Sequence, residues 1–157
     1  MLRKITGYHK DDAYDWVAEL ECYHNQHVRH RPPFQVRKWT QSKSGRDSML
    51  GSELECVLCN DLAWPEALVF KRRTPEFNQQ DFPEGLKKDH STKAGVWGRI
   101  TVVEGLLHYH CDAPVDRSIL LEAGMSAAIP PGLRHRVEPQ GPVRFYVEFF
   151  ARVAQPT

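Results

Sequence analysis

The stretch that decides the fold is Gly124-Met-Ser-Ala-Ala-Ile-Pro130-Pro131-Gly132-Leu-Arg-His135. Gly124 permits a tight turn, and Pro130-Pro131-Gly132 shapes the next hairpin, because proline fixes its own φ and glycine tolerates positive φ. His135 then points from a strand into a barrel, where its imidazole can bind a metal ion. We therefore expect antiparallel β-structure around this stretch and a metal ligand at His135.

The rest of the carboxyl-terminal part supports this expectation. Short β-rich runs recur about every ten residues, with Gly and Pro at the joins, which is typical of an antiparallel sandwich or small barrel. In one run, Leu107 and Tyr109 suit the interior, so we expect His108 and His110 to face outward and bind no metal. The expected strands cover residues 96–104, 106–111, 118–121, 126–129, 135–138 and 143–153.

Composition excludes several classes of protein. The chain has 157 residues, of which 41% are hydrophobic and 26% charged, and its net charge is +1. This balance is that of an ordinary soluble protein and not of a globally basic nucleic-acid binder. No apolar stretch is long enough to span a bilayer, and Met1–Gly7 lacks the apolar core of a secretory signal. We expect a cytoplasmic protein.

The chain divides into two expected domains, residues 1–62 and 63–157. The first is loop-rich and holds three of the four cysteines. A segment of about 60 residues buries little surface and usually needs a staple such as a metal ion. Within it we expect a strand over 16–22, a hairpin partner over 27–30, and a helix over 44–50.

A structural zinc site is the expected staple. Cys56-x-x-Cys59 lets two thiolates reach one ion from a tight turn, and Cys22 with one histidine would complete a tetrahedron. His24 is the nearest candidate as Cys-x-His, His27 competes from across the hairpin, and His30 ranks behind both. Binding would supply on the order of 10 kcal/mol of folding free energy.

Basic and aromatic residues also interleave in the first part. Arg29, Arg31 and Arg37 occur near Phe34 and Trp39, a pattern that can bind phosphate backbones and stack bases. We favour the alternative, a solvated face balanced by nearby acidic residues, because this part carries no net charge. Those acids are Asp11, Asp12 and Asp15.

Residues 5–60 resemble a small bacterial family of uncharacterised zinc-ribbon-like domains. The resemblance rests on Ile5–His9, Trp16–Leu20, Cys22–His30 with Pro32-Pro33, and Glu55–Cys59. It implies a zinc-ribbon-like fold with a metal site and no particular activity.

The Gly124-to-His135 stretch resembles the second motif of the cupin family, except that Pro139 replaces an asparagine. The first cupin motif is degraded, because only His90 lies near its expected place and Gly98 stands where a glutamate should be. The expected fold class is therefore mainly β, a small zinc-ribbon-like domain followed by a cupin (jelly-roll) β-barrel, without a full four-ligand centre.

Nearly all of residues 68–151 is similar to the tellurite-resistance-protein-B-like family. The similarity rests on Lys71–Phe77, Lys93–Gly98 and Pro142–Phe150. The resemblance implies a homodimer and a pocket for one divalent metal, which could be Zn, Fe, Mn or Ni. Carried onto this chain, the ligands are His90, His135 and, as a third, Glu148. Glu148 has a competing role, an ion pair with an arginine on the outer strand face.

The expected function is binding, sensing or transforming a small anionic or oxidised molecule, in line with the family's link by name to tellurite or oxidative stress. Arg99, Arg134 and Tyr146 are candidates for orienting such a molecule. The alternative is a non-enzymatic zinc-ribbon module that binds nucleic acid or protein, attached to a dimerising barrel. The sequence contains no nucleophile–base pair, phosphate loop or dinucleotide fingerprint, so it assigns no reaction.

Overall fold

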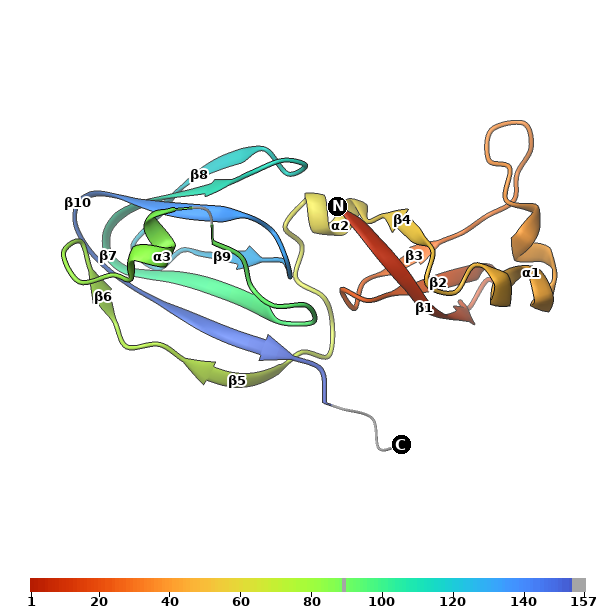
Figure 1. Cartoon of the computed structure of the whole chain (residues 1–157), viewed down its shortest axis with the longest axis horizontal. Coiled ribbons are helices and arrows are strands. Elements are labelled where there is room, and N and C mark those ends of the chain that lie inside the picture. The colour runs from red at the N-terminus through yellow and green to blue at the C-terminus, as the bar shows by residue number, and fades with distance from the viewer. Residues whose placement is uncertain (89, 154–157) are drawn as a thin grey trace. The chain divides into compact units, whose positions relative to one another are not determined.

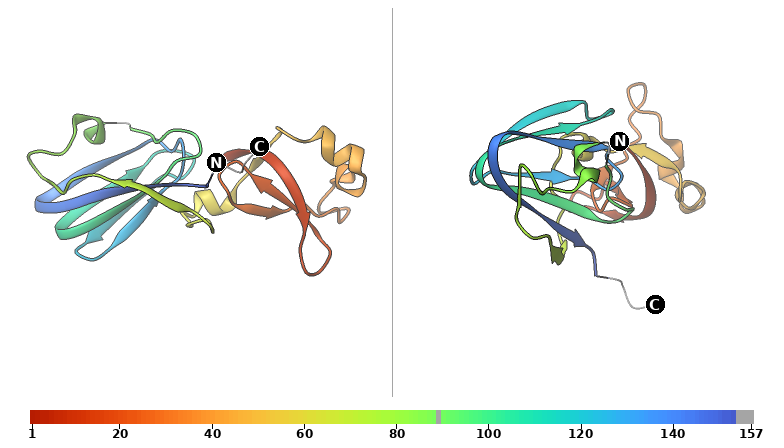
Figure 2. Two further views of the ribbon diagram at one scale, coloured as in Figure 1. Left: turned by 90° about the horizontal axis from the view of Figure 1, so that it is seen from below. Right: turned by 60° about the vertical axis from the view of Figure 1, so that its left-hand side comes forward.

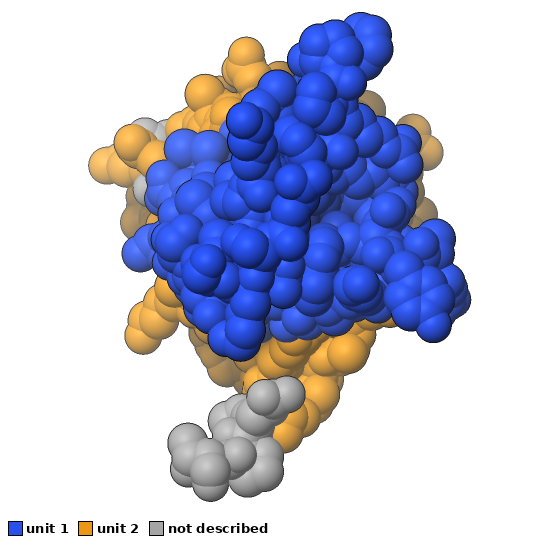
Figure 3. Space-filling view, turned by 90° about the vertical axis from the view of Figure 1, so that its right-hand side faces the viewer, with its two compact units in different colours: residues 1–57 blue, residues 58–157 orange. Residues whose placement is uncertain are grey.

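The computed structural model describes residues 1–88 and 90–153. The chain forms two compact units, residues 1–57 and 58–157, which are coloured separately in Figure 3. The expected division after residue 62 lies slightly further along the chain. In the described ranges, no helix has the length and apolar character needed to cross a membrane.

The first unit is built on a four-stranded antiparallel sheet (Figure 1). Its order is β3-β2-β1-β4, with β1 at Leu2–Lys10, β2 at Trp16–Leu20, β3 at Asn25–His27 and β4 at Glu53–Glu55. The central strand β1 was not anticipated from the sequence. Its Ile5 packs inward with side chains of β2 and the segment after β3, and the buried set is Ile5, Val17, Ala18, Leu20 and Val28.

Two short helices follow β3 in the chain, η1 at Lys38–Gln41 and α1 at Lys43–Ser48. The Ser42 hydroxyl accepts a hydrogen bond from the Gly45 amide at 3.0 Å and caps the first turn of α1. Strand β4 ends at Glu55, and α2 (Val57–Asn60) begins directly after Cys56. The Cys56-x-x-Cys59 segment is therefore a helical turn.

The second unit is built on an antiparallel sheet of six strands and includes the short helix α3 at Glu84–Lys87. Its main order is β5-β10-β7-β8, while β6 pairs with β10 and β9 pairs with β7. The strands are β5 (Val69–Arg73), β6 (Phe77–Asn78), β7 (Trp97–Cys111), β8 (Arg117–Glu122), β9 (Ser126–Ile129) and β10 (His135–Ala151).

Strands β7 and β10 each merge two strands that the sequence predicts as separate. They pair along their whole length, with a register shift between Pro139 and Val143. β7 passes through Gly105 at φ 80°, where an added Cβ would lie 2.1 Å from the Pro142 carbonyl oxygen. One half of β7 pairs with β8 and the other with β9. Because both long strands belong to both halves, the sheet curls around its core (Figure 2).

The core lies inside this curl. Ile100, Val102, Leu107 and Tyr109 of β7 are completely buried, as the period-two alternation of a strand requires. His108 and His110 lie on the opposite, half-buried face of β7, as expected. The expected mainly β class of the second part, with its antiparallel strands, is thus confirmed.

Candidate metal centres

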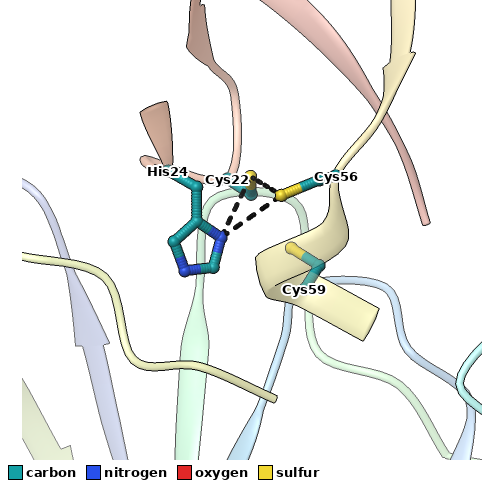
Figure 4. Close-up of side chains that lie close together, drawn as sticks. All are labelled: Cys22, His24, Cys56 and Cys59. Atoms are coloured by element: carbon teal, nitrogen blue, oxygen red, sulfur yellow. Dashed lines mark hydrogen bonds between the residues drawn. The ribbon is translucent and has the colours of Figure 1, made fainter. Parts of the chain in front are cut away.

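Four ligand atoms come together in one cluster, which we call the cysteine cluster. Cys22, His24, Cys56 and Cys59 are all buried, and their ligand atoms lie within 4.8 Å of one another. His24 Nδ1 is 3.7 Å from Cys22 Sγ and 3.4 Å from Cys56 Sγ, and the two sulfurs are 3.8 Å apart. Figure 4 shows the four side chains converging on one point.

These separations fit a tetrahedral zinc site. Zinc binds thiolate sulfur at about 2.3 Å and imidazole nitrogen at about 2.0–2.1 Å. A tetrahedron with these bonds has edges of about 3.8 Å between two sulfurs and about 3.6 Å between sulfur and nitrogen. A disulfide would need an S–S distance of about 2.05 Å, and none of the four cysteines of the chain forms one.

Local backbone structure places each half of the cluster. Tyr23 adopts φ 73°, and its amide donates to the Leu20 carbonyl at 2.8 Å. This tight turn at the end of β2 presents Cys22 and His24 from one side. On the other side, the Cys56 amide donates to the Met1 carbonyl at 2.8 Å, and the helical turn of α2 brings Cys59 back toward Cys56.

The cysteine cluster is closed to solvent. Cys22 and Cys59 have no exposed surface, and Cys56 and His24 are 1% and 4% exposed. Four protein ligands leave no position for water or substrate, which is the arrangement of a structural rather than a catalytic zinc site.

The structure does not bring the competing histidines into the cluster. His27 Nε2 lies 2.7 Å from an oxygen of Asp11 on the surface, and this hydrogen bond is the main cause that lowers the pKa of Asp11. His30 Nδ1 accepts a hydrogen bond from the Arg37 amide at 2.9 Å. His27, the competitor of His24, does not complete the site, because from β3 it pairs with Asp11 instead.

The interleaved basic residues of the first unit are engaged with neighbouring side chains. Arg29 and Arg31 both pair with Asp15, at 2.9 and 3.9 Å. The Arg46 guanidinium lies 3.7 Å from the ring centroid of Trp16. These contacts favour a charge-balanced, solvated face over a free phosphate-binding surface.

The second candidate centre is built on His135, at the start of β10. Its side chain is buried, and Nδ1 lies 2.9 Å from the Leu133 carbonyl oxygen. A carbonyl only accepts, so Nδ1 carries the proton and Nε2 presents its lone pair. Among the described residues, this buried Nε2 has no hydrogen-bond partner. Burial lowers the pKa of His135, which favours the neutral, metal-binding imidazole.

His90 lies beside His135 through a backbone bridge. Each residue's amide donates to the other's carbonyl at 2.8 Å, and the two ring centroids are 5.5 Å apart. Both histidines line a pocket of about 250 Å³, which we call the barrel pocket. Its other walls are mostly apolar, with Arg72, Thr74 and Thr92 as polar exceptions; the apolar side chains are Phe77, Pro83, Leu86, Ile129, Val147 and Phe149.

Glu148 does not join this pair. On β10, Val147 and Phe149 line the barrel pocket, so Glu148 between them faces the opposite side of the sheet. There it pairs with Arg99 at 3.0 Å. The expectation that Glu148 is a third ligand is therefore corrected in favour of the ion pair.

The three residues expected to orient a ligand lie outside the barrel pocket. Neither Arg99, Arg134 nor Tyr146 lines the barrel pocket, and the Tyr146 ring lies under Arg73 at 3.5 Å. Arg72, Thr74 and Thr92 line it instead. Their positions depend on the pairing of β5 with β10 and on the loop before β7. No local sequence motif predicts either feature.

Comparison with known proteins assigns both parts of the chain. Residues 6–63, which contain the whole cysteine cluster, match the family described as "Protein of unknown function (DUF3565)", and residues 72–147 match the "TehB-like domain". The Escherichia coli (strain K12) protein described as "Uncharacterized protein YeaR" is 33% identical over 96 residues, 55% of this chain and 80% of the relative.

Two solved structures are similar to the second part. A protein from E. coli (strain K12) has a TM-score of 0.57 and 30% identity, over 61% of this chain and 93% of the other. TehB from Haemophilus influenzae has a TM-score of 0.50 and 22% identity, over 55% of this chain and 32% of the other, a likeness of fold alone. The match to YeaR covers 80% of that relative's length at 33% identity, and two family models match successive parts of this chain. The chain therefore belongs to the TehB-like family and carries a DUF3565 domain before its TehB-like domain.

Proposed function

We propose that this protein is a metal-dependent small-molecule binder. In this proposal the cysteine cluster holds a structural zinc ion, and the barrel pocket holds one divalent transition metal on His135 and His90. The observation that carries the second site is the buried, unprotonated Nε2 of His135, which lines the pocket and has no partner among the described residues.

The donor set favours a particular kind of metal. Imidazole nitrogen suits Zn, Cu, Fe and Ni better than Mg or Ca. The Leu133 carbonyl fixes the tautomer and ring orientation of His135, as outer hydrogen bonds do for most metal-binding histidines.

Two protein ligands leave coordination positions open, and a metal held this way can act as a Lewis acid on a bound oxygen. The walls of the pocket around this point are mostly apolar. We propose that the molecule bound there is small and anionic or oxidised, and that the protein serves a tellurite or oxidative stress response. This last step is supported by the family resemblance alone.

Elemental analysis of the purified protein and its variants tests this proposal. Wild type is expected to hold two metal ions per chain, and His135→Ala to lose only the barrel metal. Cys56→Ser is expected to lose only the zinc ion of the cysteine cluster. Two controls keep both ions: His108→Ala removes an outward histidine, and Glu148→Gln removes the carboxylate paired with Arg99.

Thermal unfolding of each variant checks that metal loss does not follow from general unfolding, and His90→Ala provides a second variant of the same site. A His135→Ala protein that is folded and still holds two metal ions would contradict the barrel site. A wild type with zinc alone at one ion per chain would do the same.

A further inference from the structure

The barrel pocket continues outward into a second hollow. The inner pocket and an adjoining one of about 350 Å³ share four lining residues, Arg72, His90, Thr92 and Phe149. The outer hollow adds Lys71 and Lys93. Arg72 thus lines both hollows, between the buried His135 of the first and the lysine side chains of the second.

Arg72 differs from the other arginines of this sheet. Arg73, Arg99 and Arg144 each pair with a carboxylate, on Glu76, Glu148 and Glu104 respectively. The Arg72 guanidinium instead lies over the Phe149 ring, 4.2 Å from its centroid, and makes no ion pair with the described carboxylates. Stacking on a ring holds the guanidinium in place while leaving its N–H donors available.

Strand register explains why these two adjacent arginines differ. Arg72 pairs with Phe149 and Arg73 with Glu148, so successive residues of β5 point to opposite faces of the sheet. Arg72 faces the pocket with Phe149, whereas Arg73 faces outward above Tyr146 and beside Glu76.

The lining also limits what can bind. No Asp or Glu of the described residues lines either hollow, so an anion meets no opposing carboxylate there. The inner volume of about 250 Å³ has room for about eight water-sized groups. Its apolar side chains would leave a fully hydrated inorganic oxyanion without partners on most sides.

We propose that the barrel pocket binds a small organic carboxylate, with its apolar chain or ring between Phe77, Ile129 and Val147 and its carboxylate on the guanidinium of Arg72. This inference rests on the proposed function that the barrel pocket takes a small ligand, and it names the chemical class. Arg72 is the specificity-determining residue, because it is the side chain that distinguishes a carboxylate from a neutral molecule of the same shape.

Isothermal titration calorimetry with hexanoate and its neutral analogue hexanamide tests the proposal on the full-length protein. Hexanoate, with about eight non-hydrogen atoms, is expected to bind in about the micromolar to millimolar range. A charged hydrogen bond to Arg72 is expected to favour hexanoate over hexanamide by about tenfold or more.

Arg72→Gln is expected to remove this preference, so that both compounds bind about equally. Arg73→Gln is the matched control, since the neighbouring arginine points to the other face, and it is expected to keep the preference. Circular dichroism establishes that both variants are folded, and their metal content is expected to equal that of wild type.

Three results would overturn the proposal: no hexanoate binding by wild type, an unchanged preference in Arg72→Gln, or tighter binding of inorganic phosphate than of hexanoate. The metal content of His135→Ala is a separate measurement, so a missing barrel metal and a missing carboxylate preference are distinguishable failures.

Discussion

The two candidate metal centres differ in how many protein ligands they supply and in what surrounds them. The cysteine cluster gathers four buried ligand atoms at tetrahedral separations. The barrel pocket offers two imidazoles at the wall of an open cavity. The first arrangement suits a structural metal ion, because four protein ligands leave no position for another molecule, whereas the second leaves coordination positions open. Ligand number and access therefore suit the two centres to different roles.

The largest expected effect comes from emptying the cysteine cluster. Cys56→Ser, or treatment with a strong chelator, is expected to remove zinc and on the order of 10 kcal/mol of folding free energy from the first unit. In two-dimensional ¹H–¹⁵N spectra the dispersed signals of residues 1–57 should collapse while those of the second unit remain.

Cys111→Ser provides the matched control, because Cys111 is buried in the second unit and outside the cluster. This variant should keep its zinc and the dispersed signals of the first unit. A zinc-free Cys56→Ser protein with an unchanged spectrum would show that the small sheet needs no metal.

A second comparison separates His24 from His27. His24→Ala should lower zinc affinity by at least about tenfold. Mutating a residue that only hydrogen-bonds to a metal ligand already lowers affinity by about 10–100-fold, and His24 is itself a proposed ligand. His27→Ala loses only an exposed pair with Asp11, which contributes little because solvent screens it, so zinc affinity should not change. Competition against a chromophoric chelator measures both affinities, and equal losses in the two variants would refute the assignment of His24.

The last prediction concerns the stability of the second unit at Gly98, which stands where a cupin glutamate would lie. A Cβ at Gly98 would lie 2.9 Å from Ile129 Cδ1, so Gly98→Ala should destabilise the second unit by about 1–3 kcal/mol through overpacking. Urea unfolding measures this loss. Adding Ile129→Val, which removes the clashing methyl group, should recover part of the stability, and a strictly additive double mutant would argue against this contact.

Prediction from sequence succeeded where the signal is local. Cys56 and Cys59 share one turn and Cys22 lies near His24 on another, so their spacing predicted one cluster, although it left His24 and His27 as alternatives. Alternation along β7 likewise placed His108 and His110 outside, because the strand period is two. The strand β1 escaped notice because its alternating burial does not follow side-chain polarity: the charged Arg3 is buried with Ile5, whereas the apolar Leu2 is exposed.

The remaining features depend on pairings between distant residues. Gly105 and Pro139 look like strand ends, yet β7 and β10 continue through them because each bends along its partner. Arg72 reaches the barrel pocket only because β5 pairs with β10 in the register that sets it against Phe149. Nothing within β5 itself indicates which of two consecutive arginines turns inward.

The two backbone hydrogen bonds between His90 and His135 have a consequence for how the barrel site can change. Main-chain atoms set the spacing of this pair, so the position of residue 90 is independent of the side chain placed there. Exchanging that imidazole for a thiol, carboxylate or amide would alter metal preference while the scaffold stays the same. A single substitution at position 90 is therefore expected to change the metal preference of the proposed barrel site, in evolution or by design.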